Sequence, residues 1–99
     1  MRRFCFHPEA EREFFEQQSY YDECEAGLGA RFAYEVWKGI KLICESPQLF
    51  APAYGVRNCF LQIFPFNIVF EELDGVIVIY AVAHTRRRPG YWRNRVSDF

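Results

Sequence analysis

The chain has 99 residues, of which 51% are hydrophobic and 19% aromatic, and its formal net charge is −1. This length predicts a single domain with a modest core, and this composition excludes a disordered chain. Because no apolar run reaches the roughly 18 residues of a membrane span and no signal-peptide pattern opens the chain, we expect a soluble, cytoplasmic protein.

The first predicted elements are a short strand at residues 4–6 and a helix that begins at His7 and Pro8. Proline is favoured at the first helical position, and we interpret His7 as the helix cap. Apolar residues recur at helical spacing on this helix, and Gly27 and Gly29 end it. The predicted apolar stripe consists of Ala10, Phe14, Tyr21 and Cys24.

A second helix is predicted from about Ala30 to Ser46, and Pro47 ends it. Two helices joined by a short glycine-containing connection form an antiparallel hairpin. The stripe that faces the core is predicted to consist of Phe32, Val36, Ile40 and Ile43.

The periodicity then changes to that of strands, in the segments "VRNCFLQIF", "FNIVFEEL" and "GVIVIYAVAH". Asp74-Gly75 lies between the last two and is a strong hairpin-turn signal. The order strand, helix, helix, three strands predicts one α+β domain over residues 1–99. Its small, mostly antiparallel sheet carries the helical hairpin on one face.

A two-residue turn at Asp74-Gly75 places Leu73 opposite Val76 and thereby predicts which side chains share a face. One face is wholly apolar and must take the helices: Phe66, Ile68, Phe70, Ile79, Ala81 and Ala83. The other is half polar: Asn67, Val69, Glu71, Val78, Tyr80, Val82 and His84. We expect this second face to meet water, a ligand or a partner.

The segment "HTRRRPGYWRNR", residues 84–95, contains five arginines and no acid. It is either a solvated terminus or an edge that grips phosphate, since arginine recognises phosphate with a fork of donors. His84 is suited to proton transfer near neutral pH, although a histidine at a strand end is often structural. Tyr91 and Trp92 could stack on an unpaired base, and Arg57 lies on a neighbouring strand.

Other groups offer little chemistry. Glu71 shares the predicted open face with His84, but it lies about 20 Å away along the strand and cannot join one site with it. The four cysteines have no C-x-x-C pair, and we interpret them as reduced core thiols. No metal or cofactor is expected.

Several segments, in their order and spacing, resemble the RelE/ParE superfamily of type II toxin–antitoxin (plasmid stabilisation) toxins. They are "HPEAERE", "SYYDE", "GLGARF", "SPQLF", "FPFNIVFE" and "VAHTRRRPGYW". The resemblance implies a small toxin, a sheet flanked by a helical hairpin, and a cognate antitoxin that holds the toxin inactive in a hetero-oligomer. The predicted antitoxin surface is the open face around Asn67, Val69, Tyr80 and Val82, or the helical hairpin.

The resemblance leaves the target open. RelE-like members cleave mRNA on the ribosome, whereas ParE-like members poison DNA gyrase. Arg86, Arg87 and Tyr91 resemble the C-terminal pair of the nuclease branch, and His84 resembles a strand-end histidine of several members. Residues 58–64 depart from the nuclease pattern, because they offer Gln62 and apolar residues in place of its basic ones.

We therefore predict a metal-independent endoribonuclease. His84 or Tyr91 would transfer protons, and Arg57, Arg86 and Arg87 would hold the phosphate. Contacts to the target are predicted for Arg88, Trp92 and Arg93, whereas Arg93 and Arg95 should act mainly by steering. The alternatives are a gyrase inhibitor without enzymatic activity and a degenerate toxin that only binds its antitoxin.

Overall fold

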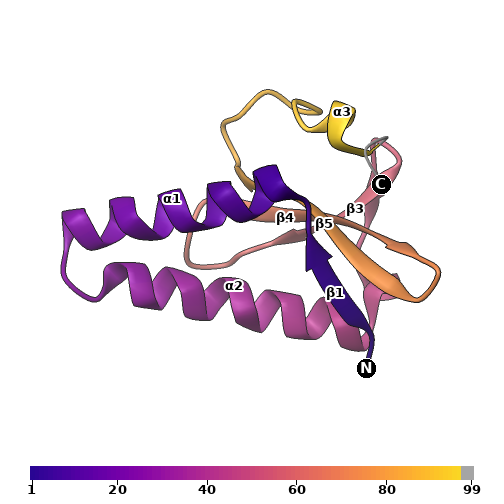
Figure 1. The fold of residues 1–99 in the computed structure, drawn as a ribbon, viewed down its shortest axis with the longest axis horizontal. Coiled ribbons are helices and arrows are strands. Elements are labelled where there is room, and N and C mark those ends of the chain that lie inside the picture. The colour runs from indigo at the N-terminus through magenta and orange to yellow at the C-terminus, as the bar shows by residue number, and fades with distance from the viewer. Residues whose placement is uncertain (97–99) are drawn as a thin grey trace.

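The computed structural model describes residues 1–96 as an α+β domain (Figure 1), which confirms the predicted fold class. Its helices are α1 (Pro8–Cys24), α2 (Leu28–Glu45) and α3 (Arg93–Val96), and the 3-10 helix η1 spans Pro47–Leu49. Its strands are β1 (Arg3–Phe6), β2 (Pro52–Ala53), β3 (Val56–Phe60), β4 (Phe66–Leu73) and β5 (Val76–His84). The sheet order is β1-β5-β4-β3-β2; β1 and β5 pair in parallel, and the other three pairs are antiparallel.

The start of α1 follows the prediction. The His7 side chain caps it, because its Nδ1 accepts a hydrogen bond from the Glu9 backbone N–H at 3.1 Å, and Pro8 occupies the first helical position. The predicted stripe is correct for Ala10 and Phe14, which are buried. It is wrong for Cys24, which is exposed because the end of α1 extends beyond the sheet (Figure 1).

The connection between α1 and α2 brings the two helices into close contact. Helix α2 begins at Leu28, two residues before the predicted start, after Gly27 adopts a left-handed φ of 90°. The Gly29 N–H then donates to Asp22 Oδ1 at 2.8 Å. A Cβ at Gly29 would lie 2.4 Å from the carbonyl oxygen of Gln18, so this approach requires glycine.

The hairpin covers one face of the sheet and buries an apolar core against it. All four predicted α2 positions are buried, at 0–2% exposure: Phe32, Val36, Ile40 and Ile43. Aromatic rings fill the space between the helices and β4, with Phe32 centred 5.2 Å from Phe66 and 5.4 Å from Phe64. Residues 61–64, predicted to continue a strand, form a loop with Pro65 that places Phe64 in this core.

The predicted β4–β5 register is correct near the turn and wrong beyond it. Leu73 pairs with Val76 and Phe70 with Ile79, but Val69 pairs with Ala81, so Tyr80 is an extra residue in a β-bulge. The bulge reverses the faces of all later β5 residues. Val82 therefore packs in the core under the hairpin, whereas Ala81 and Ala83 lie on the opposite face.

The opposite face is also covered, contrary to prediction. The chain returns over it after β5, and Trp92 packs against Val69, Tyr80, Ala81 and Ala83 with only 4% of its own surface exposed. The residues predicted to present an antitoxin surface are at most 9% exposed: Asn67, Val69, Tyr80 and Val82. Within residues 1–96, no helix is long and apolar enough to cross a membrane.

Candidate functional site

Residues 85–96, here called the C-terminal segment, turn back over the sheet directly after β5. The Thr85 N–H donates to the Pro65 carbonyl at 2.9 Å, and the Arg87 N–H donates to the His84 carbonyl at 2.9 Å. Gly90 has a φ of 80°, which glycine adopts without strain and which lets the chain reverse before Trp92. The segment thus has a defined path, and three arginines stand at its outer bend.

Arg86, Arg87 and Arg88, here called the arginine run, are exposed. The guanidinium carbon of Arg87 lies 3.8 Å from the centre of the Tyr91 ring, a distance typical of a cation–π contact. Within residues 1–96, none of the ion pairs includes a member of the run. The run is therefore an accessible cationic edge with one of its members held on an aromatic platform.

The Tyr91 hydroxyl is anchored to helix α1. It donates to Glu13 Oε2 at 2.8 Å, and Arg95 pairs with the same carboxylate at 2.9 Å. Burial raises the pKa of Tyr91 well above its usual value, and the negative charge and hydrogen bond of Glu13 raise it further. At neutral pH, Tyr91 is thus a protonated donor and not a base.

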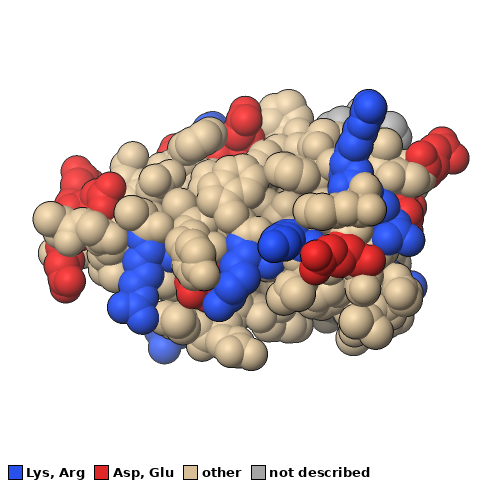
Figure 2. All heavy atoms as spheres, turned by 90° about the horizontal axis from the view of Figure 1, so that it is seen from below, with Lys and Arg blue, Asp and Glu red and all other residues tan. Residues whose placement is uncertain are grey.

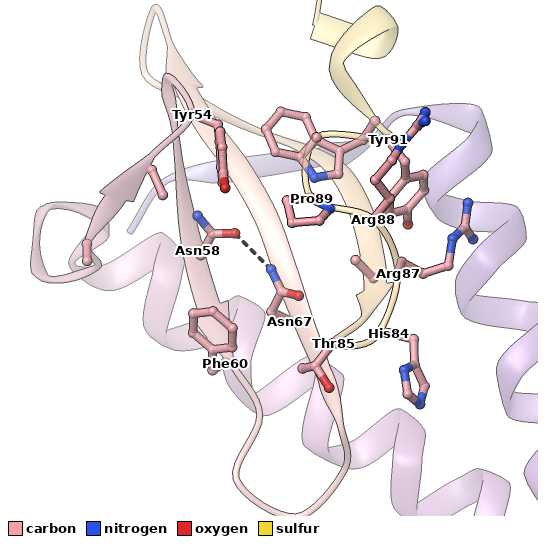
Figure 3. A pocket seen from close by; sticks show the side chains of 15 residues that line it. Tyr54, Asn58, Phe60, Asn67, His84, Thr85, Arg87, Arg88, Pro89 and Tyr91 are labelled. Atoms are coloured by element: carbon pink, nitrogen blue, oxygen red, sulfur yellow. Dashed lines mark hydrogen bonds between the residues drawn. The ribbon is translucent and has the colours of Figure 1, made fainter.

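His84 ends β5 and is half-buried. Its Nδ1 accepts a hydrogen bond from the Arg86 backbone N–H at 3.0 Å, and its ring meets Phe66 edge-on, with centres 5.1 Å apart. In the neutral imidazole, an accepting Nδ1 leaves the proton on Nε2. His84 therefore presents a donor, and its ring points away from Asn58 and Asn67 (Figure 3).

A cleft of about 230 Å³ lies between the C-terminal segment and the β3–β4 part of the sheet. Asn67 Nδ2 donates to Asn58 Oδ1 at 2.8 Å on its floor. Figure 3 shows Tyr54 on one side of the cleft, with Arg87 and Arg88 on the other. Sequence reasoning assigned no site role to Tyr54 or Asn58; the available signal was one asparagine on each of two neighbouring strands.

The structure brings most of the predicted site residues to this cleft. Its lining includes His84, Arg87, Arg88, Tyr91 and Trp92. Arg86 adjoins it through its bond to His84, and Arg93 stands 5.3 Å from the Tyr54 ring. Trp92, predicted to stack on a base, is instead buried against the sheet.

Two arginines make contacts that the sequence analysis did not predict. Arg57 pairs with Phe70 in the β3–β4 ladder, whereas His84 pairs with Phe66, so their partners on β4 are four positions apart. Its side chain donates to the Phe50 carbonyl at 2.7 Å, outside the cleft. Arg95, predicted to act by steering, is only 9% exposed and forms a partly buried ion pair with Glu13.

Comparison with solved structures shows a similarity in fold. No family model matches the chain, and no curated protein sequence matches it. The structure is similar to a chain solved as "Chromosomal ParDE TA system from P. aeruginosa", with a TM-score of 0.73 and 15% identity. The alignment covers 85% of this chain and 96% of that chain. This similarity shows that the chain has a ParE-like fold, the α+β architecture predicted from its resemblance to the RelE/ParE superfamily.

Proposed function

We propose that this chain is the toxin of a type II toxin–antitoxin module and that it acts by binding its target through the arginine run. The observation that carries the proposal is the run itself. Three consecutive exposed arginines, unpaired with acids within residues 1–96, stand on a segment that is fixed to the domain. The similarity to a chain from a ParDE TA system supports the assignment.

The groups around the cleft favour binding over RNA cleavage. Cleavage at a ribose 2′-hydroxyl needs a group that accepts its proton. The Tyr91 hydroxyl stays protonated and donates a hydrogen bond to Glu13, and His84 Nδ1 already accepts a hydrogen bond from the Arg86 N–H. The described residues that line the cleft include no carboxylate. We therefore favour a gyrase-binding toxin over the nuclease that the sequence alone favoured.

One observation keeps the endoribonuclease as the second candidate. The His84 ring lies at the same bend as the arginine run and presents an Nε2–H donor. Such a donor, beside guanidinium groups, can stabilise a phosphate oxygen or protonate a leaving group. In this candidate function, RNA or ribosome would supply the missing proton acceptor.

Two assays with the purified protein distinguish the two candidate functions. It is incubated with DNA gyrase and plasmid DNA, and separately with translating ribosomes. A gyrase-binding toxin blocks supercoiling or traps cleaved DNA and leaves mRNA intact, and His84→Gln changes its potency little. Ribosome-dependent cuts in the mRNA, reduced about a hundredfold or more in rate by His84→Gln, would instead support the nuclease.

For the antitoxin, we propose the outer surface of the helical hairpin. Large apolar side chains there are 43–63% exposed: Phe15 and Tyr20 on α1, and Tyr34, Trp37 and Leu42 on α2. Figure 2 shows the α2 side of the molecule, where broad tan areas separate the charged side chains. Exposed apolar patches of this kind mark protein interfaces.

Hydrogen exchange with and without the antitoxin tests this surface. Protection of α1 and α2 amides on complex formation would support it. Protection confined to the C-terminal segment would contradict it.

A further inference from the structure

Strand β5 is longer than the strand beside it. β1 pairs with the Val76–Ile79 part of β5, and the His7 N–H then donates a hydrogen bond to the Ile79 carbonyl at 2.8 Å. Among residues 1–96, no further strand pairs with β5 on that side as it continues to His84. An unpaired sheet edge exposes backbone donors and acceptors, which need partners when they are buried.

Two side chains from distant parts of the chain occupy this edge. The Val82 N–H donates to Glu13 Oε1 at 3.0 Å. Arg95 Nη1 donates to the Tyr80 carbonyl at 2.8 Å and to Glu13 Oε1 at 3.1 Å. The Glu13 carboxylate from α1 and the Arg95 guanidinium from α3 therefore make hydrogen bonds to the β5 backbone at positions that β1 does not reach.

Glu13 also connects this edge to the arginine run. Its second oxygen accepts from the Tyr91 hydroxyl at 2.8 Å and from Arg95 Nη2 at 2.9 Å. The Tyr91 ring is in turn the platform for the Arg87 guanidinium, 3.8 Å from its centre. One carboxylate thus accepts four hydrogen bonds and fixes the ring on which the second arginine of the run rests.

We propose that Glu13 is a positioning residue that docks the C-terminal segment and thereby orients the arginine run. The role in target binding rests on the proposed function; the docking role does not. Glu13 does not contact the run itself, and it acts through Tyr91 and Arg95. Removing it leaves Arg95 buried without its charge partner, a situation that proteins relieve by exposing the charge. Because the segment is short and packs mainly through Trp92, we expect it to detach locally while the hairpin core stays folded.

Trp92 fluorescence reports this docking. The chain has two tryptophans, Trp37 at 43% exposure and Trp92 at 4%, so a Trp37→Phe background leaves one buried reporter. In that background, Glu13→Ala should red-shift the Trp92 emission and raise its acrylamide quenching several-fold. Glu16→Ala is the matched control, since it removes an exposed acid from the same helix and should change neither.

Toxicity supplies the functional readout, measured as the induction level that arrests growth of the host cells. Glu13→Ala should raise this level on the order of tenfold or more, which corresponds to about 1.4 kcal/mol or more of lost binding. Tyr91→Phe keeps the ring and removes only its bond to Glu13, so we expect a smaller shift in the same direction. If Glu13→Ala does not fold, Tyr91→Phe decides the outcome with the same two readouts.

Two results would overturn the proposal. Trp92 could remain shielded in the folded Glu13→Ala or Tyr91→Phe protein, in which case Glu13 does not dock the segment. Alternatively, the segment could detach while toxicity stays at the wild-type level, in which case docking does not position the run. Failure of the proposed function is separate: an Arg86→Ala/Arg87→Ala variant that stays fully toxic removes the run from the mechanism, whatever Trp92 reports.

Discussion

The two faces of the sheet are closed by different forces. On the hairpin face, α1 and α2 bury a continuous apolar core in which Phe14, Phe32 and Phe66 pack at ring distances of 5.2–6.0 Å. On the opposite face, a twelve-residue segment is held by Trp92 and by the ion pair of Arg95 with Glu13. We therefore expect the first face to contribute most of the folding stability, and the second to position the arginine run.

The largest effect is expected in the hairpin core. Phe32 is fully buried among aromatic rings, so Phe32→Ala leaves a cavity that the helices cannot close. We expect the free energy of unfolding to fall by about 3–5 kcal/mol, a large part of the total for a domain of this size. Urea denaturation monitored by circular dichroism measures it. A loss below about 1 kcal/mol would contradict the assignment of stability to this face.

Trp92→Ala makes the corresponding change on the opposite face. We expect a smaller global loss, roughly 1–3 kcal/mol, because the segment can detach without unfolding the core. Hydrogen exchange separates the two variants: Trp92→Ala should raise exchange in residues 84–96 and spare α2, whereas Phe32→Ala should raise it throughout. Equal acceleration in both regions would mean that the two faces unfold as one unit.

The close contact between α1 and α2 gives a third test of the hairpin. Gly29→Ala places a methyl group 2.4 Å from the backbone oxygen of Gln18, and we expect a cost of about 1–3 kcal/mol. Gly39→Ala is the control on the same helix. Its added Cβ would lie 3.1 Å from the end of the Ile68 side chain, which can move aside, so its melting temperature should fall less. The reverse order would contradict the described helix packing.

Alkaline pH should modestly reduce the stability of the protein through Tyr80, which is buried on the sheet face opposite the hairpin. Burial raises the pKa of Tyr80 to about 12, with a further contribution from its hydrogen bond to Glu71. The unfolded chain releases this proton near pH 10, whereas the folded protein keeps it up to about pH 12. The free energy of unfolding should therefore decrease as pH rises through this window.

Tyr80→Phe should reduce the slope of that decrease, measured by urea denaturation at several pH values. An unchanged slope would show that Tyr80 does not titrate with folding. The variant also loses the bond to Glu71, 3.0 Å long, so the comparison uses the slope and not the absolute stability.

The helices and strands were predicted well because residue spacing and turn residues reflect the backbone conformation of their own segment. The spacing of Phe32, Val36, Ile40 and Ile43 predicted the buried side of α2, and Asp74-Gly75 predicted the β4–β5 turn. The bulge at Tyr80 was not predictable from the sequence. Residues 76–83 are all apolar, so the pattern of apolar and polar residues does not show where an extra residue interrupts the strand. Its effect was to invert Val82 and Ala83 relative to the predicted faces.

The site was predicted less completely, because its geometry depends on contacts far apart in the sequence. In the sequence, Glu13 is one of several acids in the first turns of an acidic helix. Its partner Arg95 lies 82 residues later, so no local pattern indicates that the two residues pair. The arginines around Trp92 suggest an exposed aromatic side chain. Trp92 is buried because it packs against a sheet face formed by residues distant in the sequence. The sequence did indicate that the arginine run is charged and accessible: residues 84–95 contain no acid, and Arg86, Arg87 and Arg88 are exposed in the structure.

The most direct test of the central claim is the toxicity of the Arg86→Ala/Arg87→Ala variant, measured by growth arrest on induction. Exposed arginines contribute little to folding, so its melting temperature should match the wild type. An Arg31→Ala/Lys41→Ala variant removes the same charge from exposed positions of α2 and is the control. We predict that the first variant loses toxicity and the second keeps it. A folded Arg86→Ala/Arg87→Ala protein that still binds its antitoxin and arrests growth at the wild-type induction level would contradict the account.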